Sequence, residues 1–345
     1  MNEELAIILE TASKIFNKHV NHDLRQFIDK ENINLINLWN DIEEQGLSKI
    51  IVKEKFNGSG LPFSFILPLI KISNNFGTPL PFSETILSNY LLSESDINPP
   101  NGIVTFATDG VDINITNNKI SGKLRSIPFL NLTDKIILIT EIKNIKNIIL
   151  LHNTSEKLEP KKNFLADPRF DLQIKNCEII DIKPLNSKID FNHLGALMRS
   201  AQMIGSMEKA LDLSIDYCSQ RKQFGRTLSK FQAIQHQISE MAVELSASSA
   251  ALSAVGNIDE ANKNIQDNAI AILKIRAGIA AGKIIAISHQ VHGAIGFTQE
   301  YELAYFTRNL NSWRNDFGNE NFWETFLGKK FLENSNQNLW EYLTY

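Results

Sequence analysis

Residues 221–236 read RKQFGRTLSKFQAIQH, a basic and aromatic segment with a single glycine. Apolar residues recur at helical spacing on both sides of it, as Leu211 and Ile215 before and as Met241 and Leu245 after. By residue type alone, the segment is a helix–loop–helix connection with a solvated arginine and a packed phenylalanine. Short motifs of this kind often occur without a function, so the rest of the chain must decide its meaning.

Length and composition are those of an ordinary soluble globular protein. The 345 residues suffice for two or three domains, and 43% are hydrophobic while 21% are charged. A net charge of −4 argues against nucleic-acid binding. The two cysteines, Cys177 and Cys218, fit neither a disulfide framework nor a zinc site, so we expect no metal. The acidic start and the lack of a long apolar run predict a cytoplasmic protein that enters no membrane.

The residue pattern divides the chain into three blocks. Residues 1–98 read as helices, residues 99–188 as short strands, and residues 189–345 as helices again. In the middle block, Asn117 and Asn118 predict a hairpin turn. Ser83 is expected to cap a helix. The expected helices include 5–16, 38–46, 65–75, 265–292 and 322–331, and the expected strands are 102–107, 111–115, 135–140, 146–151 and 172–182.

The segment 221–236 resembles the flavin-contacting loop of the acyl-CoA dehydrogenase family, which reads R-x-x-F-G, then a Leu, then F-Q-x-x-x-H. Residues 290–300, QVHGAIGFTQE, resemble the family's Q-x-x-G-G-x-G-F segment, with Ala294 in place of the second glycine. Residues 77–82, GTPLPF, resemble a short-chain branch of the family that includes subunits of heteromeric, steroid-type enzymes. The resemblance covers nearly the whole chain.

The resemblance implies an α+β multidomain fold with an N-terminal helical domain, a middle β-barrel or sandwich domain and a C-terminal four-helix-bundle domain. It also implies FAD-dependent α,β-dehydrogenation of an acyl-CoA in a homo- or hetero-oligomer. Electron-transfer flavoprotein or a similar acceptor is the implied redox partner, and the 221–236 loop is expected to reach the flavin of a neighbouring subunit. The residues expected to contact FAD are Arg221, Gln223, Phe224, Gly225, Phe231, Gln290, Gly293, Gly318 and Asn319.

Two elements of the family are missing from the sequence. The middle block has Ala107–Gly110 where the family has its T-E-x-x-x-G-S flavin loop. The glutamate that removes the substrate α-proton falls on Phe317, and a rarer position for this base falls near Gly195, where no carboxylate stands. Asp316 is the best remaining candidate for the base, with Glu320 second, although both also fit solvated loop carboxylates.

The other ionisable residues point to structural roles. His236, His289 and His292 lie beside apolar helix residues without a second metal ligand at suitable spacing, so they fit hydrogen-bonded structural groups. A further set of carboxylates fits a solvated helix face and helix end: Glu240, Glu244, Asp259 and Glu260.

Three functions remain open from the sequence. The chain is an FAD-dependent acyl-CoA dehydrogenase with a displaced base, or a catalytically silent partner subunit of a heteromeric acyl-CoA dehydrogenase. A flavin monooxygenase on the same fold, which needs no carboxylate at position 317, is the third. The colour of the purified protein separates the second from the other two.

Overall fold

The computed structural model describes residues 3–26, 28–29, 31–154, 167–186, 190–256 and 263–333. The chain forms two compact units, one from residues 1–69 and 78–189 and the other from residues 70–77 and 190–345. The N-terminal helices and the strands therefore share one unit, and the last helices form most of the other. The expected boundary at 188–189 lies outside the described residues.

The N-terminal helices follow the amphipathic pattern of their sequences. They are α1 (Glu3–His19), α2 (His22–Gln26), α3 (Ile33–Glu44), α4 (Ile66–Asn75) and α5 (Phe82–Glu94). Phe16 of α1 packs edge-on against Phe82 at 5.7 Å between ring centroids. The predicted cap at Ser83 is wrong: α5 begins one residue earlier, after Pro81 and without a side-chain cap, because Ser83 is buried within the first turn.

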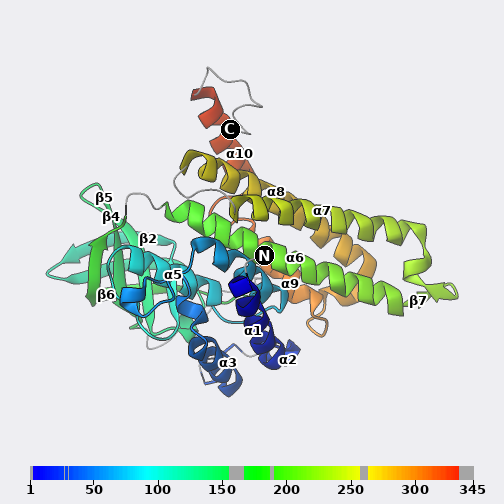
Figure 1. The fold of residues 1–345 in the computed structure, drawn as a ribbon, viewed down its shortest axis with the longest axis horizontal. Helices are drawn as coiled ribbons and strands as arrows, with labels where there is room; N and C mark the ends of the chain where they lie inside the picture. The colour runs from blue at the N-terminus through cyan, green and yellow to red at the C-terminus, as the bar shows by residue number, and fades with distance from the viewer. Residues whose placement is uncertain are drawn as a thin grey trace. The chain divides into compact units, whose positions relative to one another are not determined.

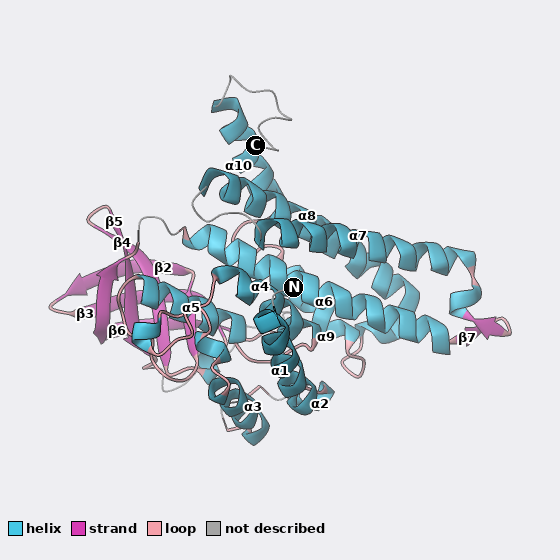
Figure 2. Cartoon of the chain, viewed as in Figure 1, coloured by secondary structure: helices cyan, strands magenta, loops and turns pink. Residues whose placement is uncertain are grey.

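The strands form one six-stranded sheet in the order β1-β4-β5-β6-β3-β2 (Figure 2). They are β1 (Val104–Ala107), β2 (Asp109–Thr116), β3 (Lys119–Pro128), β4 (Lys135–Ile142), β5 (Ile145–His152) and β6 (Arg169–Pro184). The predicted hairpin is confirmed, since Asn117 and Asn118 join β2 to β3 with φ of 50° and 59°, as a type I′ turn requires. The long strand β6 pairs with both β3 and β5, and one face of the sheet buries Ile120, Leu124 and Ile149.

The second unit is a helical bundle. Helices α6 (Phe191–Gln220), α7 (Gln232–Gly256) and α8 (Lys263–His292) run side by side, as Figure 1 shows, and α9 (Leu303–Trp313) packs on α6. Helix α10 (Glu320–Glu333) packs on α8. The expected fold class is confirmed by this bundle together with the helices and sheet of the first unit. Among the described helices, none is long and apolar enough to cross a membrane.

One of the carboxylates expected to be solvated is not. Glu244 is buried between α7 and α8, where it forms ion pairs with Arg276 and with Lys283, the latter at 2.5 Å. A buried carboxylate needs such partners to offset the loss of its hydration, and helix periodicity alone does not indicate which polar face meets another helix. Glu240 is half-buried, and Asp259 and Glu260 lie outside the described residues.

Candidate active site

The segment 221–231 contains a β-hairpin that joins α6 to α7. Strand β7 (Lys222–Gln223) pairs with β8 (Arg226–Thr227), and the Leu228 amide donates to the Arg221 carbonyl at 2.9 Å. The two turn residues, Phe224 and Gly225, both have positive φ, at 51° and 78°. This is the geometry of a two-residue type I′ turn, which costs glycine nothing and phenylalanine some strain.

The hairpin carries a cationic and aromatic surface that faces solvent. Phe224 is 92% exposed at the tip. The Arg226 guanidinium lies 4.1 Å from the centroid of the Phe231 ring, so a cation–π contact holds the base of the hairpin. Arg221 is exposed and makes no side-chain hydrogen bond or ion pair to another described residue. A guanidinium of this kind is available for a phosphate.

The segment 290–297 begins where α8 ends. Gly293 takes a φ of 66°, and Gln290 before it is exposed. His292 is buried beneath this turn: Nδ1 lies 2.7 Å from the Ser288 carbonyl oxygen, Nε2 lies 3.2 Å from the Tyr301 hydroxyl, and the ring stacks on Tyr217. His292 therefore anchors the turn as a structural group.

His289 supports the same segment from one turn earlier on α8. Its ring stacks on Phe297 at 4.0 Å, and its Nε2 lies 3.0 Å from the Thr307 hydroxyl. Burial lowers the pKa of His289, and the neighbouring His292 lowers it further. Burial also lowers the pKa of His292, although the hydrogen bond to Ser288 opposes part of that effect. Neutral rings are thus favoured in both positions. His236, by contrast, is exposed.

The two base positions expected from the sequence meet in the bundle. The Phe317 ring lies on the backbone of Gly195 in α6, so close that any Cβ at 195 would overlap ring carbons Cδ1, Cε1 and Cζ. Phe191 packs edge-on against the same ring, with centroids 5.4 Å apart. The rings of Phe191 and Phe317 therefore pack together against Gly195. Neither position 195 nor position 317 supplies a carboxylate.

The carboxylates on either side of Phe317 are engaged in ion pairs. Asp316 accepts a hydrogen bond from Nε of Arg199 at 2.9 Å, and Arg199 has no solvent exposure. Glu320 accepts from Nε of Arg314 at 2.8 Å. Burial by itself would raise the pKa of Glu320, but the hydrogen bond and charge of Arg314 outweigh burial and hold that pKa below its usual value. Glu320 therefore lacks the raised pKa that favours a general base.

A buried lysine closes this network. The Lys274 ammonium donates to the Trp313 and Arg314 carbonyls, both at 2.9 Å, and so satisfies the end of α9. Burial lowers the pKa of Lys274 to about 8, against the opposing charges of Asp316 and Glu320. Gly278, one turn along α8 from Lys274, leaves the room that Glu320 occupies.

Gly318 and Asn319 contribute to local structure. Gly318 has a φ of 92°, and a side chain there would overlap Phe322. The Asn319 side-chain oxygen accepts from the Phe322 amide at 3.0 Å and thereby caps α10. The indole Nε1 of Trp323 donates to the Phe317 carbonyl at 3.0 Å. The segment that carries Phe317 is therefore fixed at both of its ends.

The family's flavin loop is missing from the sheet as well as from the sequence. Strand β1 ends at Ala107 and β2 begins at Asp109, so Thr108 alone separates them. Because the backbone passes directly from one strand to the next, no loop of the family's length is present there. The residues of this chain thus fit the phosphate and adenine side of FAD, through the 221–231 hairpin, better than its ring side.

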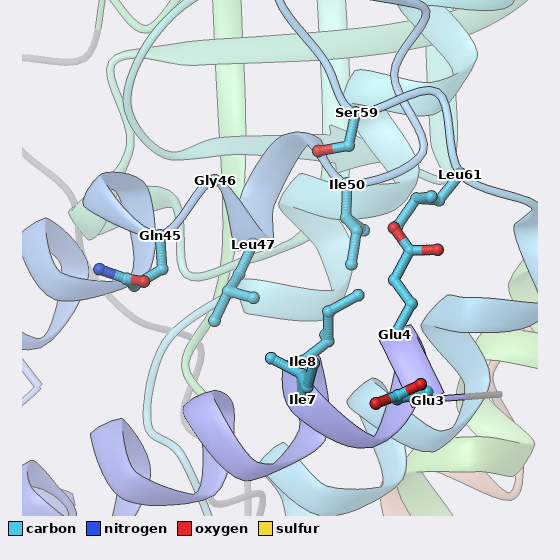
Figure 3. A pocket seen from close by; sticks show the side chains of 10 residues that line it. All are labelled: Glu3, Glu4, Ile7, Ile8, Gln45, Gly46, Leu47, Ile50, Ser59 and Leu61. Carbon is cyan, nitrogen blue, oxygen red and sulfur yellow. The ribbon is translucent and has the colours of Figure 1, made fainter. Parts of the chain in front are cut away.

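A groove of about 560 Å³ in the first unit contains none of the predicted site residues. Figure 3 shows it between α1 and the segment 45–61, with Leu47 and Ile50 pointing toward α1. Glu3 and Glu4 also line it. The apolar part of its lining comes from Ile7, Ile8, Leu47, Ile50 and Leu61.

Residues 190–327 match the family of acyl-CoA dehydrogenase C-terminal domains. Residues 190–327 therefore carry an acyl-CoA dehydrogenase C-terminal domain. It is 23% identical over 316 residues to the acyl-CoA dehydrogenase IpdE2 of Mycolicibacterium smegmatis, an alignment that covers 89% of this chain and 93% of the relative.

Solved structures share the fold over nearly the whole chain. A variant of the Tcur3481-Tcur3483 steroid ACAD superposes with a TM-score of 0.84 at 18% identity, covering 97% of this chain and 99% of that one. A chain of the ChsE4-ChsE5 complex from Mycobacterium tuberculosis gives a TM-score of 0.82 at 14% identity, covering 96% and 98%. At these identities the likeness concerns the fold.

Several residues that shape this site were missed from the sequence. Arg199 and Lys274 sit inside long helices, where nothing in the local pattern distinguishes a buried cation from a solvated one. Phe191 is the first residue of α6, and its sequence neighbours do not show that it meets Phe317. Gly278 and Gly282 gave a usable signal, since two glycines four residues apart on one helix face indicate a close approach. That approach is made by Glu320 and Arg314.

Proposed function

We propose that this chain is a flavin-contacting subunit of a heteromeric acyl-CoA dehydrogenase whose catalytic base stands in the partner chain. The observation that carries the proposal is the exposed hairpin tip: an aromatic ring in a strained turn beside an unengaged arginine. A soluble protein gains nothing from such a tip by itself, whereas a partner's cofactor would cover it. The ChsE4-ChsE5 complex, a neighbour in fold, is itself an assembly of two kinds of chain.

The role of the hairpin follows from its chemistry. FAD, when bound, supplies the acceptor for the β-hydride of the acyl-CoA. Arg221 would pair with its pyrophosphate through a planar fork of N–H donors, and Phe224 would form an apolar wall beside the adenine. Gln290 and the exposed backbone at Gly293 lie at the neighbouring end of α8 and would extend the same surface.

The lack of a base favours a subunit over a self-sufficient enzyme. Removal of the α-proton needs a carboxylate within about 3 Å of it. Phe317 accepts no proton, and the ion pairs of Asp316 and Glu320 keep both carboxylates occupied with arginine. The single residue between β1 and β2 also argues that the isoalloxazine ring is held mainly by another chain.

Oligomer formation through the bundle completes the proposal. Val243 on α7 is 65% exposed, and Ile272 and Ile279 on α8 are more than a third exposed. These apolar side chains lie beside alanines on long helices, a surface that suits another helix pair. Electron-transfer flavoprotein is the acceptor that the family resemblance favours.

The test is FAD content after purification with a partner chain. Full-length protein alone should be colourless, and the complex should be yellow. Replacing Arg221 with Ala should weaken the affinity of the complex for FAD at least about tenfold, since a charge-assisted bidentate contact contributes about 1.5–3 kcal/mol. The FAD content of the purified complex should fall accordingly. Lys329→Ala, an exposed cation of the same unit, is the control and should retain FAD.

The competing function, an enzyme with its own base, makes a different forecast. A yellow oligomer of this chain alone, whose FAD is reduced by an acyl-CoA, would refute the subunit proposal. In that event Asp316→Asn and Glu320→Gln should be compared by stopped-flow reduction, because loss of a competent base costs about 10²–10⁴-fold in rate.

A further inference from the structure

Phe317 stands at the position expected for the base and packs closely against Gly195 and Phe191. This packing involves more than the replacement of one carboxylate by a phenylalanine. The Phe317 ring occupies the space in which a side chain at 195 would stand. Its accommodation therefore depends on glycine at that position. Phe191, at the start of the same helix, closes the ring's other side with an interplanar angle of 87°.

The backbone at Phe317 shows that its surroundings impose this arrangement. Phe317 has a φ of 56°, which is strained for a bulky side chain. The strain is maintained by the indole of Trp323, which binds the Phe317 carbonyl, and by the ion pair of Asp316 with Arg199 just before it. A conformation held from both sides resists reorientation of the ring.

We infer that Phe317 is an aromatic stopper: seated on Gly195 and braced by Phe191, it fills the position of the base and keeps the reacting carbons of an acyl chain out of this chain's own site. The meaning of the position rests on the proposed function, while the packing stands independently of it. An acyl-CoA would then be processed only in the partner's site.

The packing half of the inference is tested by a double-mutant cycle on the full chain. Gly195→Ala should lower the melting temperature by on the order of 5 °C, because a methyl group is forced against the ring. In the Phe317→Ala background the same change should be neutral or stabilising, since alanine favours a helix more than glycine does. Phe317→Leu repeats the comparison if Phe317→Ala fails to fold. Additive effects at the two positions would overturn the matched pair.

The functional half is tested by comparing octanoyl-CoA with free CoA in equilibrium binding to the same proteins. The wild-type chain should bind both about equally, and Phe317→Ala should prefer octanoyl-CoA at least about tenfold. Phe322→Ala, a half-exposed aromatic of the same unit, should behave as wild type. A clear octanoyl preference in the wild type, or none in Phe317→Ala, would contradict the stopper even if the cycle succeeds. FAD content of the Arg221→Ala complex reports on the subunit proposal separately.

Discussion

Asp316 illustrates how a single contact decides the role of a residue. Its carboxylate forms an ion pair with Arg199, a guanidinium without solvent exposure, so its removal takes away an opposite charge beside a buried cation. We expect Asp316→Asn to reduce the free energy of unfolding by about 3 kcal/mol, measured by urea denaturation. Glu240→Gln, at a half-buried carboxylate on α7, should change it far less. An unchanged stability of Asp316→Asn would reopen the role of this residue as a base.

Lys274 provides a prediction about pH. Its pKa is about 8 in the folded chain and near 10.4 in an unfolded one, so the full cost of burying the ammonium is present below pH 8. Between pH 8 and 10.4 the folded chain releases this proton while the unfolded chain keeps it, and stability rises with pH. Relative to Lys274→Met, the wild type should gain up to the order of 3 kcal/mol across that window. A difference that is flat from pH 7.5 to 10.5 would contradict the burial of a charged lysine.

Two histidines near the end of α8 should make the stability of the segment that follows it depend on pH. His289 and His292 have lowered pKa values, so the stability that they contribute is present above their unfolded pKa of about 6.5 and is lost on acidification. We expect the protection factors of the amides in residues 290–301, which are corrected for the intrinsic exchange rate at each pH, to fall below pH 6.5. His292→Gln should remove most of that pH dependence, and a segment equally protected at pH 5 and pH 8 would argue against it.

Helices and strands can be predicted from the sequence only where their residue pattern is long enough to show a period. Five strands of the sheet and the Asn117–Asn118 hairpin were predicted because alternation and turn chemistry act over neighbouring residues, whereas most of β3 (Lys119–Pro128) was not. Helix α9 was missed although its signal was present: Leu303, Phe306, Leu310 and Trp313 recur at helical spacing and are buried. The hairpin β7–β8 could not be predicted, since two-residue strands are too short to show a period.

At the scale of the whole molecule, the bundle should form the interface of an oligomer. We expect Val243→Asp on α7 to raise the fraction of monomer in light scattering, because it adds a charge to a surface that apolar side chains cover. Ile7→Asp, at an equally exposed isoleucine of α1, is the matched control and should leave the assembly intact. A stable, flavin-loaded monomer of the wild type would exclude this arrangement.

The fold of the whole molecule was accessible from sequence, whereas its site was only partly so. Block order and two motifs sufficed for the architecture, because each block repeats one kind of periodicity. The meeting of Phe317 with Gly195 joins residues far apart in the chain, and no local pattern encodes it. Counting along the motifs identified both positions, but only the structure shows the ring lying on the glycine.

The hairpin tip also has a consequence for proteolysis. Arg221, Lys222 and Arg226 surround an exposed two-residue turn, so trypsin has three cleavage sites within reach of solvent. Cutting there would separate α6 from α7 in the chain without touching the rest of the bundle. Trypsin would cleave a chain without its partner first at this tip, whereas a bound cofactor would protect the tip of an assembled chain from cleavage. Limited trypsin digestion followed by mass spectrometry would therefore read out, in a crude extract, what fraction of the molecules has found a partner.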